Sequence, residues 1–128
     1  LLIRKDSPLA EKSTISPSDI THLPLILSRQ ALSAGELSGW YGNGFDKLNI
    51  VATYNLIFNA SLLVEEDIGY ALALDKLVYT TAESKLCFRP LEPHLIAQLC
   101  VVWKKYQVFS PAAAKFISEL QNQLQNKI

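Results

Sequence analysis

Residues 48–74 constrain the fold of this 128-residue chain more than any other stretch. The stretch opens with an apolar, β-branched run at residues 48–53, which predicts a strand. From Leu56 onward the apolar residues recur at helical spacing, and Gly69 stands where that helix should end. Residues 70–74 then form a short apolar run that predicts a second buried strand. This order predicts a right-handed β–α–β crossover with a parallel pair of strands, and therefore an α/β fold.

The polar elbow between the first strand and the helix is a candidate ligand site. In α/β sheets, ligands bind at the carboxyl ends of strands and at helix N-termini, where free N–H groups and the helix dipole favour an anionic group. Hydroxyl and amide side chains at such a position can hold a carboxylate. The candidates are Thr53, Tyr54, Asn55 and Asn59.

Composition excludes several other functions. Twelve basic residues balance twelve acidic ones without a basic cluster, so this segment is not expected to bind nucleic acid. No apolar run reaches the length of a membrane span, and no signal segment opens the chain. We find no Ser/His/Asp order and no phosphate loop, and therefore predict neither an enzyme nor a cofactor.

The cysteines and histidines give no metal-binding pattern. Cys87 and Cys100 form no C-x-x-C motif, and His22 and His94 are far apart in sequence. Both cysteines lie in apolar surroundings, which predicts two buried free thiols; a disulfide between neighbouring strands is the alternative.

Other segments predict further elements on both sides of the central stretch. The abrupt start with a strand suggests a fragment of a longer chain. Gly39, Gly42 and Gly44 predict a surface turn. Ser110 and Pro111 predict the N-cap and first position of the last helix. The predicted strands are residues 1–5, 23–27, 86–90 and 96–103, and the predicted helices are residues 17–21, 34–40 and 111–125, with fraying expected over residues 121–127.

Four stretches, in this order and spacing, resemble a known family. They are LLIRKDSPLA at residues 1–10, DITHLPLIL at residues 19–27, VEEDIGYALAL at residues 64–74, and LCFRPLEPHLIAQLCVVWKKYQVFSPAAAKFI at residues 86–117. Together they resemble the C-terminal effector-binding region of LysR-type transcriptional regulators. The chain departs from the family pattern at Ser7, Asp67 and Asp75, which puts the local turn geometry in question.

The resemblance implies a fold and a domain layout. The family has two α/β subdomains like those of type 2 periplasmic binding proteins, joined by two crossover strands. Residues 1–5 would be one crossover strand, and residues 6–98 the second regulatory subdomain, a mixed, mostly parallel sheet flanked by helices. Residues 99–128 would supply the returning crossover strand, at residues 99–103, and the C-terminal helix. The DNA-binding helix-turn-helix lies outside this chain, which should therefore not read DNA alone.

The resemblance also implies a function. The chain would be the effector-binding domain of a cytoplasmic bacterial regulator that senses a small, anionic metabolite and forms a homodimer or higher homo-oligomer. The alternative is a solute-binding domain of a transporter. Carried over from the family, the ligand-binding residues after the second strand are Ser28, Arg29 and Gln30.

Each candidate side chain also has a purely structural interpretation. Asn55 is a plausible N-cap, and Thr53 an ordinary strand residue. Tyr54 is able to pack over the strand end. The remaining candidates, interpreted as solvent-facing residues, are Ser28, Arg29, Gln30 and Asn59.

Overall fold

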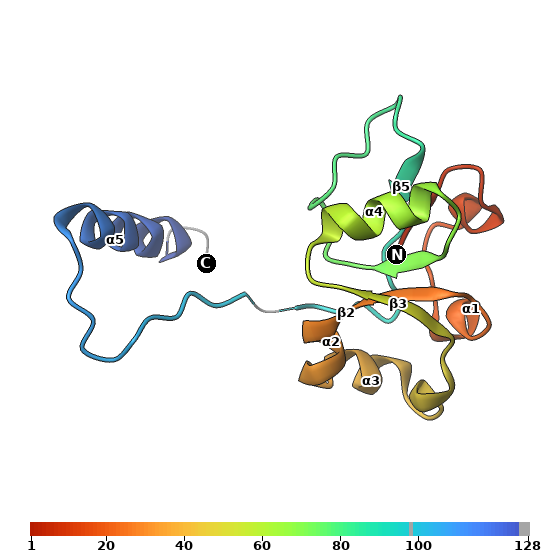
Figure 1. The fold of residues 1–128 in the computed structure, drawn as a ribbon, viewed down its shortest axis with the longest axis horizontal. Coiled ribbons are helices and arrows are strands. Elements are labelled where there is room, and N and C mark those ends of the chain that lie inside the picture. The colour runs from red at the N-terminus through yellow and green to blue at the C-terminus, as the bar shows by residue number, and fades with distance from the viewer. Residues whose placement is uncertain (98, 126–128) are drawn as a thin grey trace. The chain divides into compact units, whose positions relative to one another are not determined.

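The computed structural model describes residues 1–97 and 99–125, which fall into two compact units (Figure 1). The first unit comprises Leu1–Ala97, and the second comprises Gln98–Ile128. The boundary lies one residue from the predicted end of the second regulatory subdomain.

The first unit is built on a five-stranded mixed sheet with the strand order β3-β2-β4-β1-β5. β2 pairs in parallel with β3 and with β4, whereas β1 is antiparallel to β4 and to β5. All strands except β1 therefore run in one direction, which confirms the predicted mostly parallel α/β sheet. The strands are β1 (Leu2–Arg4), β2 (Leu25–Ser28), β3 (Ile50–Tyr54), β4 (Tyr70–Leu72) and β5 (Leu86–Phe88).

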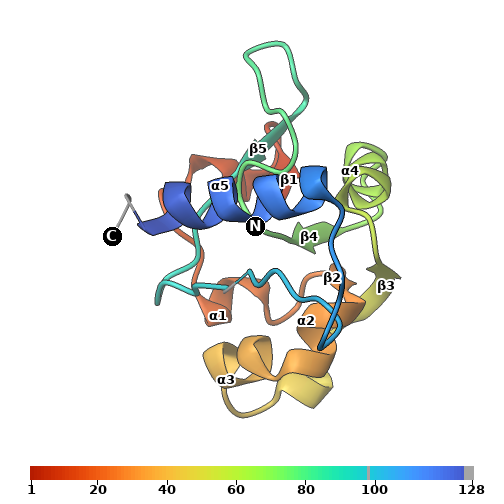
Figure 2. The same cartoon turned by 90° about the vertical axis from the view of Figure 1, so that its left-hand side faces the viewer.

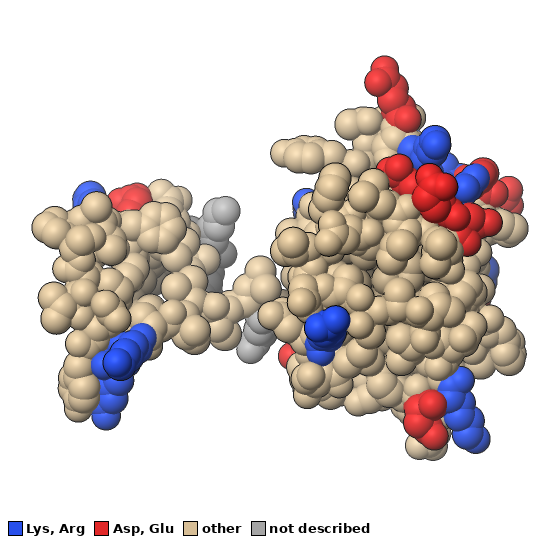
Figure 3. Space-filling view, viewed as in Figure 1, with Lys and Arg blue, Asp and Glu red and all other residues tan. Residues whose placement is uncertain are grey.

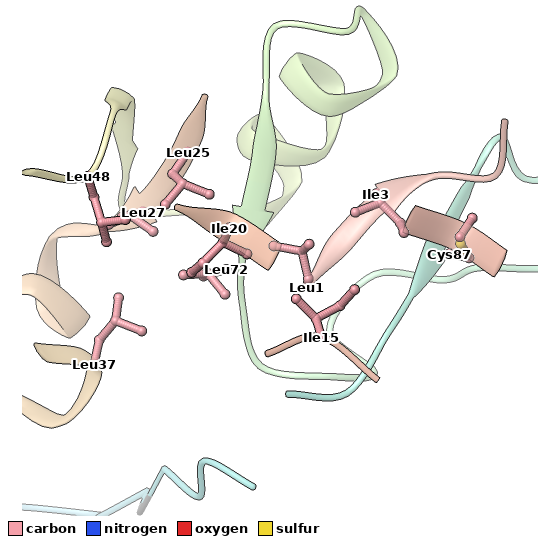
Figure 4. Close-up of a cluster of buried hydrophobic side chains, with 11 residues drawn as sticks. Leu1, Ile3, Ile15, Ile20, Leu25, Leu27, Leu37, Leu48, Leu72 and Cys87 are labelled. Atoms are coloured by element: carbon pink, nitrogen blue, oxygen red, sulfur yellow. The ribbon is translucent and has the colours of Figure 1, made fainter. Parts of the chain in front are cut away.

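Helices cover both faces of this sheet (Figure 2). One face carries α4 (Ile57–Glu65), whose Ala60 and Val64 pack into a cluster around Ile26 of β2. The other face carries a larger cluster around Leu25 and Leu27 (Figure 4). Four short elements cover that cluster: the 3-10 turn η1 (Pro8–Glu11), α1 (Pro17–Ile20), α2 (Arg29–Ala34) and α3 (Glu36–Tyr41). A second 3-10 turn, η2 (Phe45–Lys47), precedes β3.

The strands on either side of α4 are parallel, but they are not neighbours. β2 lies between β3 and β4, so the predicted parallel orientation is confirmed, but the two strands do not pair with each other. The side chains of Leu25, Ile26 and Leu27 are 0% exposed, and a strand apolar on both faces belongs in the middle of a sheet. Ile50 and Val51 of β3 remain 38% and 45% exposed, as suits an edge strand.

Gly69 does not end α4, contrary to the prediction. The helix finishes at Glu65, and the chain turns through Asp67, whose φ is 59°. A Cβ atom on Gly69 would lie 2.6 Å from the carbonyl oxygen of Pro24. Because that contact is too short for any real Cβ atom, glycine is required by the close approach of two backbones.

The sequence prediction missed α2 and shifted α3. A single helix at residues 34–40 was expected, but two short helices meet at Gly35, which has a φ of 76°. The candidate residues that follow the second strand lie at the start of α2, with Ser28 as its N-cap. Turn geometry is confirmed at Gly42 and Gly44, where φ is 82° and 94°, whereas Gly39 lies within α3.

The second unit contains α5 (Pro111–Gln125) and an extended segment. The hydroxyl of Ser110 accepts a hydrogen bond from the Ala113 N–H at 3.3 Å, which confirms the predicted helix start. The helix continues through residues 121–125, where fraying was expected; residues 126 and 127 lie outside the described residues.

The predicted strand at residues 96–103 does not form among the described residues. A strand needs a partner for its N–H and C=O groups, and no described strand pairs with this segment. Gln98 lies outside the described residues. Cys100, within this segment, is exposed, so the prediction of two buried thiols is correct only for Cys87.

Candidate functional site

The carboxyl ends of β2, β3 and β4 meet at one edge of the sheet. In the register of the parallel strands, Leu27 aligns with Thr53 and with Leu72, and Ser28 aligns with Tyr54. The two groups of predicted site residues therefore lie side by side, although 22 or more positions separate them in the sequence. This edge is where open α/β sheets bind ligands.

Arg29 is the cationic group among the predicted site residues at this edge. It is the first residue of α2, and its side chain is exposed. Its Nε atom donates a hydrogen bond to the Thr53 hydroxyl at 3.4 Å. This long hydrogen bond links the ends of neighbouring strands, and it engages only one of the guanidinium nitrogens. Among the described residues, the two terminal nitrogens of Arg29 make no hydrogen bond, so they can face a ligand.

Tyr54 is partly buried on the face of the sheet that α4 covers. Its ring packs against the cluster under α4, and its hydroxyl donates to the carbonyl oxygen of Leu72 at 2.8 Å. Burial raises the pKa of this phenol above its ordinary value. These contacts join the ends of β3 and β4 and favour the packing interpretation; ligand contact by Tyr54 stays a prediction.

The other predicted residues present polar groups near the same edge. Asn55 is exposed and does not cap α4, because the N-cap position belongs to Leu56. Asn59 and Gln30 are exposed in the first turns of their helices. Ser28 is half-buried, and its side chain does not cap α2. The structure thus brings Arg29 and Thr53 into contact, while Ser28 aligns with Tyr54, which packs on the α4 face.

Comparison with known proteins identifies the family. The model of the LysR substrate binding domain matches residues 1–125. The chain belongs to this family. The match confirms the resemblance carried by the four sequence stretches, and it makes the chain an effector-binding domain of the LysR type.

A solved structure shows the same fold. The chain resembles the crystal structure of HinK, a LysR family transcriptional regulator from Pseudomonas aeruginosa, with a TM-score of 0.68 and 21% sequence identity. The likeness covers 96% of this chain and 43% of HinK, so the chain spans less than half of that regulator. No curated protein matches the chain.

Two surface hollows of this LysR domain lie away from the predicted site, near the residues where β4 and β5 begin. One, of about 230 Å³, is lined by Arg4 and Asp6 together with the segment around Gly69. The Arg4 guanidinium contacts the Asp6 carboxylate and donates to the Glu65 carbonyl oxygen at 3.0 Å. Figure 3 shows charged side chains gathered near the end of α4. Because Arg4 already has protein partners, this hollow offers a ligand little unpaired charge.

The second hollow, of about 390 Å³, is lined by Lys5 and residues 83–85 as well as Arg4 and Asp6. The Lys5 ammonium donates to the carbonyl oxygens of Thr81 and Ala82 at 2.7 and 2.9 Å, so it holds the long loop before β5 in place. Sequence reasoning missed both hollows. No motif marks them, because they depend on residues brought together only by the antiparallel pairing of β1.

Metal and membrane signals complete the description. Within residues 1–97 and 99–125, no group of three or more His, Cys, Asp or Glu side chains is placed to hold a metal ion. None of the helices described is long and apolar enough to span a bilayer.

Proposed function

We propose that this LysR domain senses a small anionic metabolite at the carboxyl edge of β2 and β3. The observation that carries the proposal is the Arg29–Thr53 pair, which joins a cation and a hydroxyl at the ends of neighbouring parallel strands. A guanidinium group remains charged at any physiological pH and binds carboxylates through two parallel hydrogen bonds. The exposed terminal nitrogens of Arg29 suit this role.

The other site residues have distinct parts in this proposal. Thr53 orients the guanidinium through Nε, and Ser28 supplies a hydroxyl at the end of β2. The amides of Gln30, Asn55 and Asn59 give hydrogen-bonding groups for the rest of the ligand. We assign no ligand contact to the Tyr54 hydroxyl, because it is engaged with the Leu72 carbonyl.

The proposed domain layout follows the family. Residues 1–5 act as a crossover strand, residues 6–98 as the second regulatory subdomain, and residues 99–128 as the returning crossover segment and C-terminal helix. Effector binding shifts the population between packings of the subdomains in a cytoplasmic homo-oligomer, and DNA is contacted through a helix-turn-helix outside this chain. The domain has no catalytic role. The comparisons lend no support to the transporter alternative.

The test is an amide-resolved NMR titration of the chain with individual small carboxylates. We expect shifts at residues 28–30 and 53–59, and their loss in an Arg29→Gln variant. The matched control is Lys115→Gln, which removes an exposed cation from α5 and should leave the shifts unchanged. Shifts confined to other residues, or equal shifts in the Arg29→Gln variant, would contradict the site.

A further inference from the structure

Hydrogen bonds hold the segment that leads out of the first unit at three points, and its Leu91 and Leu95 also pack against the core cluster around Leu25 and Leu27. The Ile15 N–H donates to the carbonyl oxygen of Pro90 at 2.9 Å, and the Glu92 N–H donates to the carbonyl oxygen of Ile15 at 2.8 Å. The third point is the Trp40 indole N–H, which donates to the carbonyl oxygen of Pro93. The first unit ends soon afterwards, at residue 97. Among the described residues, the Trp40 contact is the last hydrogen bond that a side chain makes to this segment before the chain leaves the unit.

Trp40 is the anchor that lies on α3, the helix next to the one that begins at the proposed effector site. It lies near the end of α3, and α3 follows α2 directly through Gly35. The two helices pack against each other, and α2 begins with Arg29 at the effector edge. A run of 12 residues, 29–40, thus links the candidate ligand group to the exit segment.

The two helices of this run differ in the buried residues and side-chain hydrogen bonds that hold them in place. α2 contains no buried residue, and its N-cap makes no side-chain hydrogen bond. α3 is anchored by Leu37, which is 3% exposed, and by the Tyr41 hydroxyl, which donates to Thr21 Oγ1 at 3.1 Å. Elements with few buried contacts move at low cost in free energy, and the left-handed glycine between the helices permits a change of their angle.

We infer that Trp40 is a positioning residue that couples the effector edge to the exit segment. An anion that draws Arg29 away from Thr53 displaces α2, and the packing of α2 on α3 passes the displacement to the Trp40–Pro93 hydrogen bond. The direction in which the chain leaves the first unit then depends on the state of the effector edge. The inference rests on the proposed function at Arg29, but it can be tested without a ligand because energetic coupling between two sites is reciprocal.

The first experiment measures amide hydrogen exchange in a Trp40→Phe variant of the whole chain. Phenylalanine keeps an aromatic ring but removes the N–H, so the exit segment loses one anchor. We expect the Glu92 N–H to exchange about fivefold faster, which is the effect of losing one ordinary hydrogen bond. Tyr41→Phe is the matched control, because it removes a hydrogen bond from the neighbouring residue of α3 without touching Pro93. Unchanged exchange at Glu92 in Trp40→Phe, or an equal change in Tyr41→Phe, would overturn the inference.

The second experiment reads the coupling in the other direction. The chain has two tryptophans, so a Trp103→Phe variant assigns the two indole N–H signals. We expect Arg29→Gln to shift the Trp40 indole signal and leave the Trp103 signal in place. If the Trp40 signal does not move, the coupling is refuted. If it moves but no carboxylate binds, the coupling stands and the proposed function fails.

Discussion

Two apolar segments of this chain have opposite fates. Residues 25–27 form the central strand β2, whose side chains are 0% exposed and whose backbone pairs on both sides. Residues 99–103 have a similar apolar character, yet they form no strand, and Leu99 and Val102 are 82% and 86% exposed. The difference shows that an apolar run forms a strand only where neighbouring strands pair with its backbone and an apolar surface covers its side chains.

The helix of the second unit sharpens this lesson. α5 forms in the same unit as the unpaired segment, although Phe116 and Leu124 on its surface are 66% and 56% exposed. A helix satisfies its backbone hydrogen bonds within itself, and Ser110 and Pro111 fix where it begins. Local signals therefore suffice for a helix in this chain, whereas the strands depend on distant partners.

The largest expected effect comes from truncating one apolar side chain in each of the two regions. Ile26→Ala should lower the free energy of unfolding by about 4 kcal/mol, because it leaves a cavity in a fully buried site. Val102→Ala should change it by less than about 0.5 kcal/mol, because that side chain is exposed. Urea unfolding followed by circular dichroism measures both. A large cost for Val102→Ala would mean that the segment is buried against another surface in solution.

The next effect tests the close approach of two backbones in the first unit. Gly69→Ala should destabilise by about 3 kcal/mol, because the added methyl group meets the Pro24 carbonyl oxygen and the rigid sheet cannot yield. Gly39→Ala is the control: it lies in α3 with open space around it and should stabilise by about 0.5–1 kcal/mol. Thermal unfolding of the two variants gives the comparison. Equal melting temperatures would show that β4 and the residues before β2 separate easily.

Much of the fold followed from local patterns. Serine and proline placed the starts of α1 and α5, and apolar runs located the five strands of the first unit. The strand order could not be predicted from local patterns, because the position of β2 between β3 and β4 depends on which strand is buried on both faces. The role of Gly69 was missed for the same reason: its constraint comes from Pro24, 45 positions away in the sequence.

The candidate site was foreseen only in part. The parallel pairing of β2 and β3 places Arg29 beside Thr53, and ligand binding by these residues stays a prediction. The helix that Arg29 begins was missed although Ser28 is a favoured N-cap residue and Gln30 a good helix former, because α2 is only six residues long and buries none of them, so it gives no apolar stripe. The contact of Tyr54 with Leu72 was also beyond local reasoning, since it spans the ends of two strands separated by β2.

A smaller effect on stability is expected when the hydroxyl of a partly buried tyrosine in the first unit is removed, compared with that of an exposed tyrosine in the second. Tyr54→Phe should cost about 1 kcal/mol of stability, because it removes one partly buried hydrogen bond and leaves the Leu72 carbonyl without that donor. Tyr106→Phe should cost nothing measurable, because Tyr106 is 88% exposed. Urea midpoints give the two values. If Tyr54→Phe instead abolishes carboxylate binding and leaves stability unchanged, the Tyr54 hydroxyl binds the ligand and does not stabilise the fold.

The smallest effect concerns the start of α1 and depends on pH. The Asp19 carboxylate accepts hydrogen bonds from the Lys12 ammonium and from the backbone and hydroxyl of Ser16, which together hold its pKa at about 2. An unfolded carboxyl has its ordinary pKa, near 4, so the unfolded chain takes up the proton first as pH falls. The stabilisation from Asp19 is complete above about pH 4 and is lost progressively toward pH 2.

Asp19→Asn is the matched variant, because it keeps the size and polarity of the side chain but cannot titrate. Urea midpoints of the two proteins, measured from pH 6 to pH 2.5, should differ most at the upper end and converge as the pH falls. Other carboxyl groups, such as Asp6 beside Arg4, titrate in both proteins and cancel in the difference. A constant gap at every pH would mean that the capping geometry at Ser16, and not the charge of Asp19, stabilises α1.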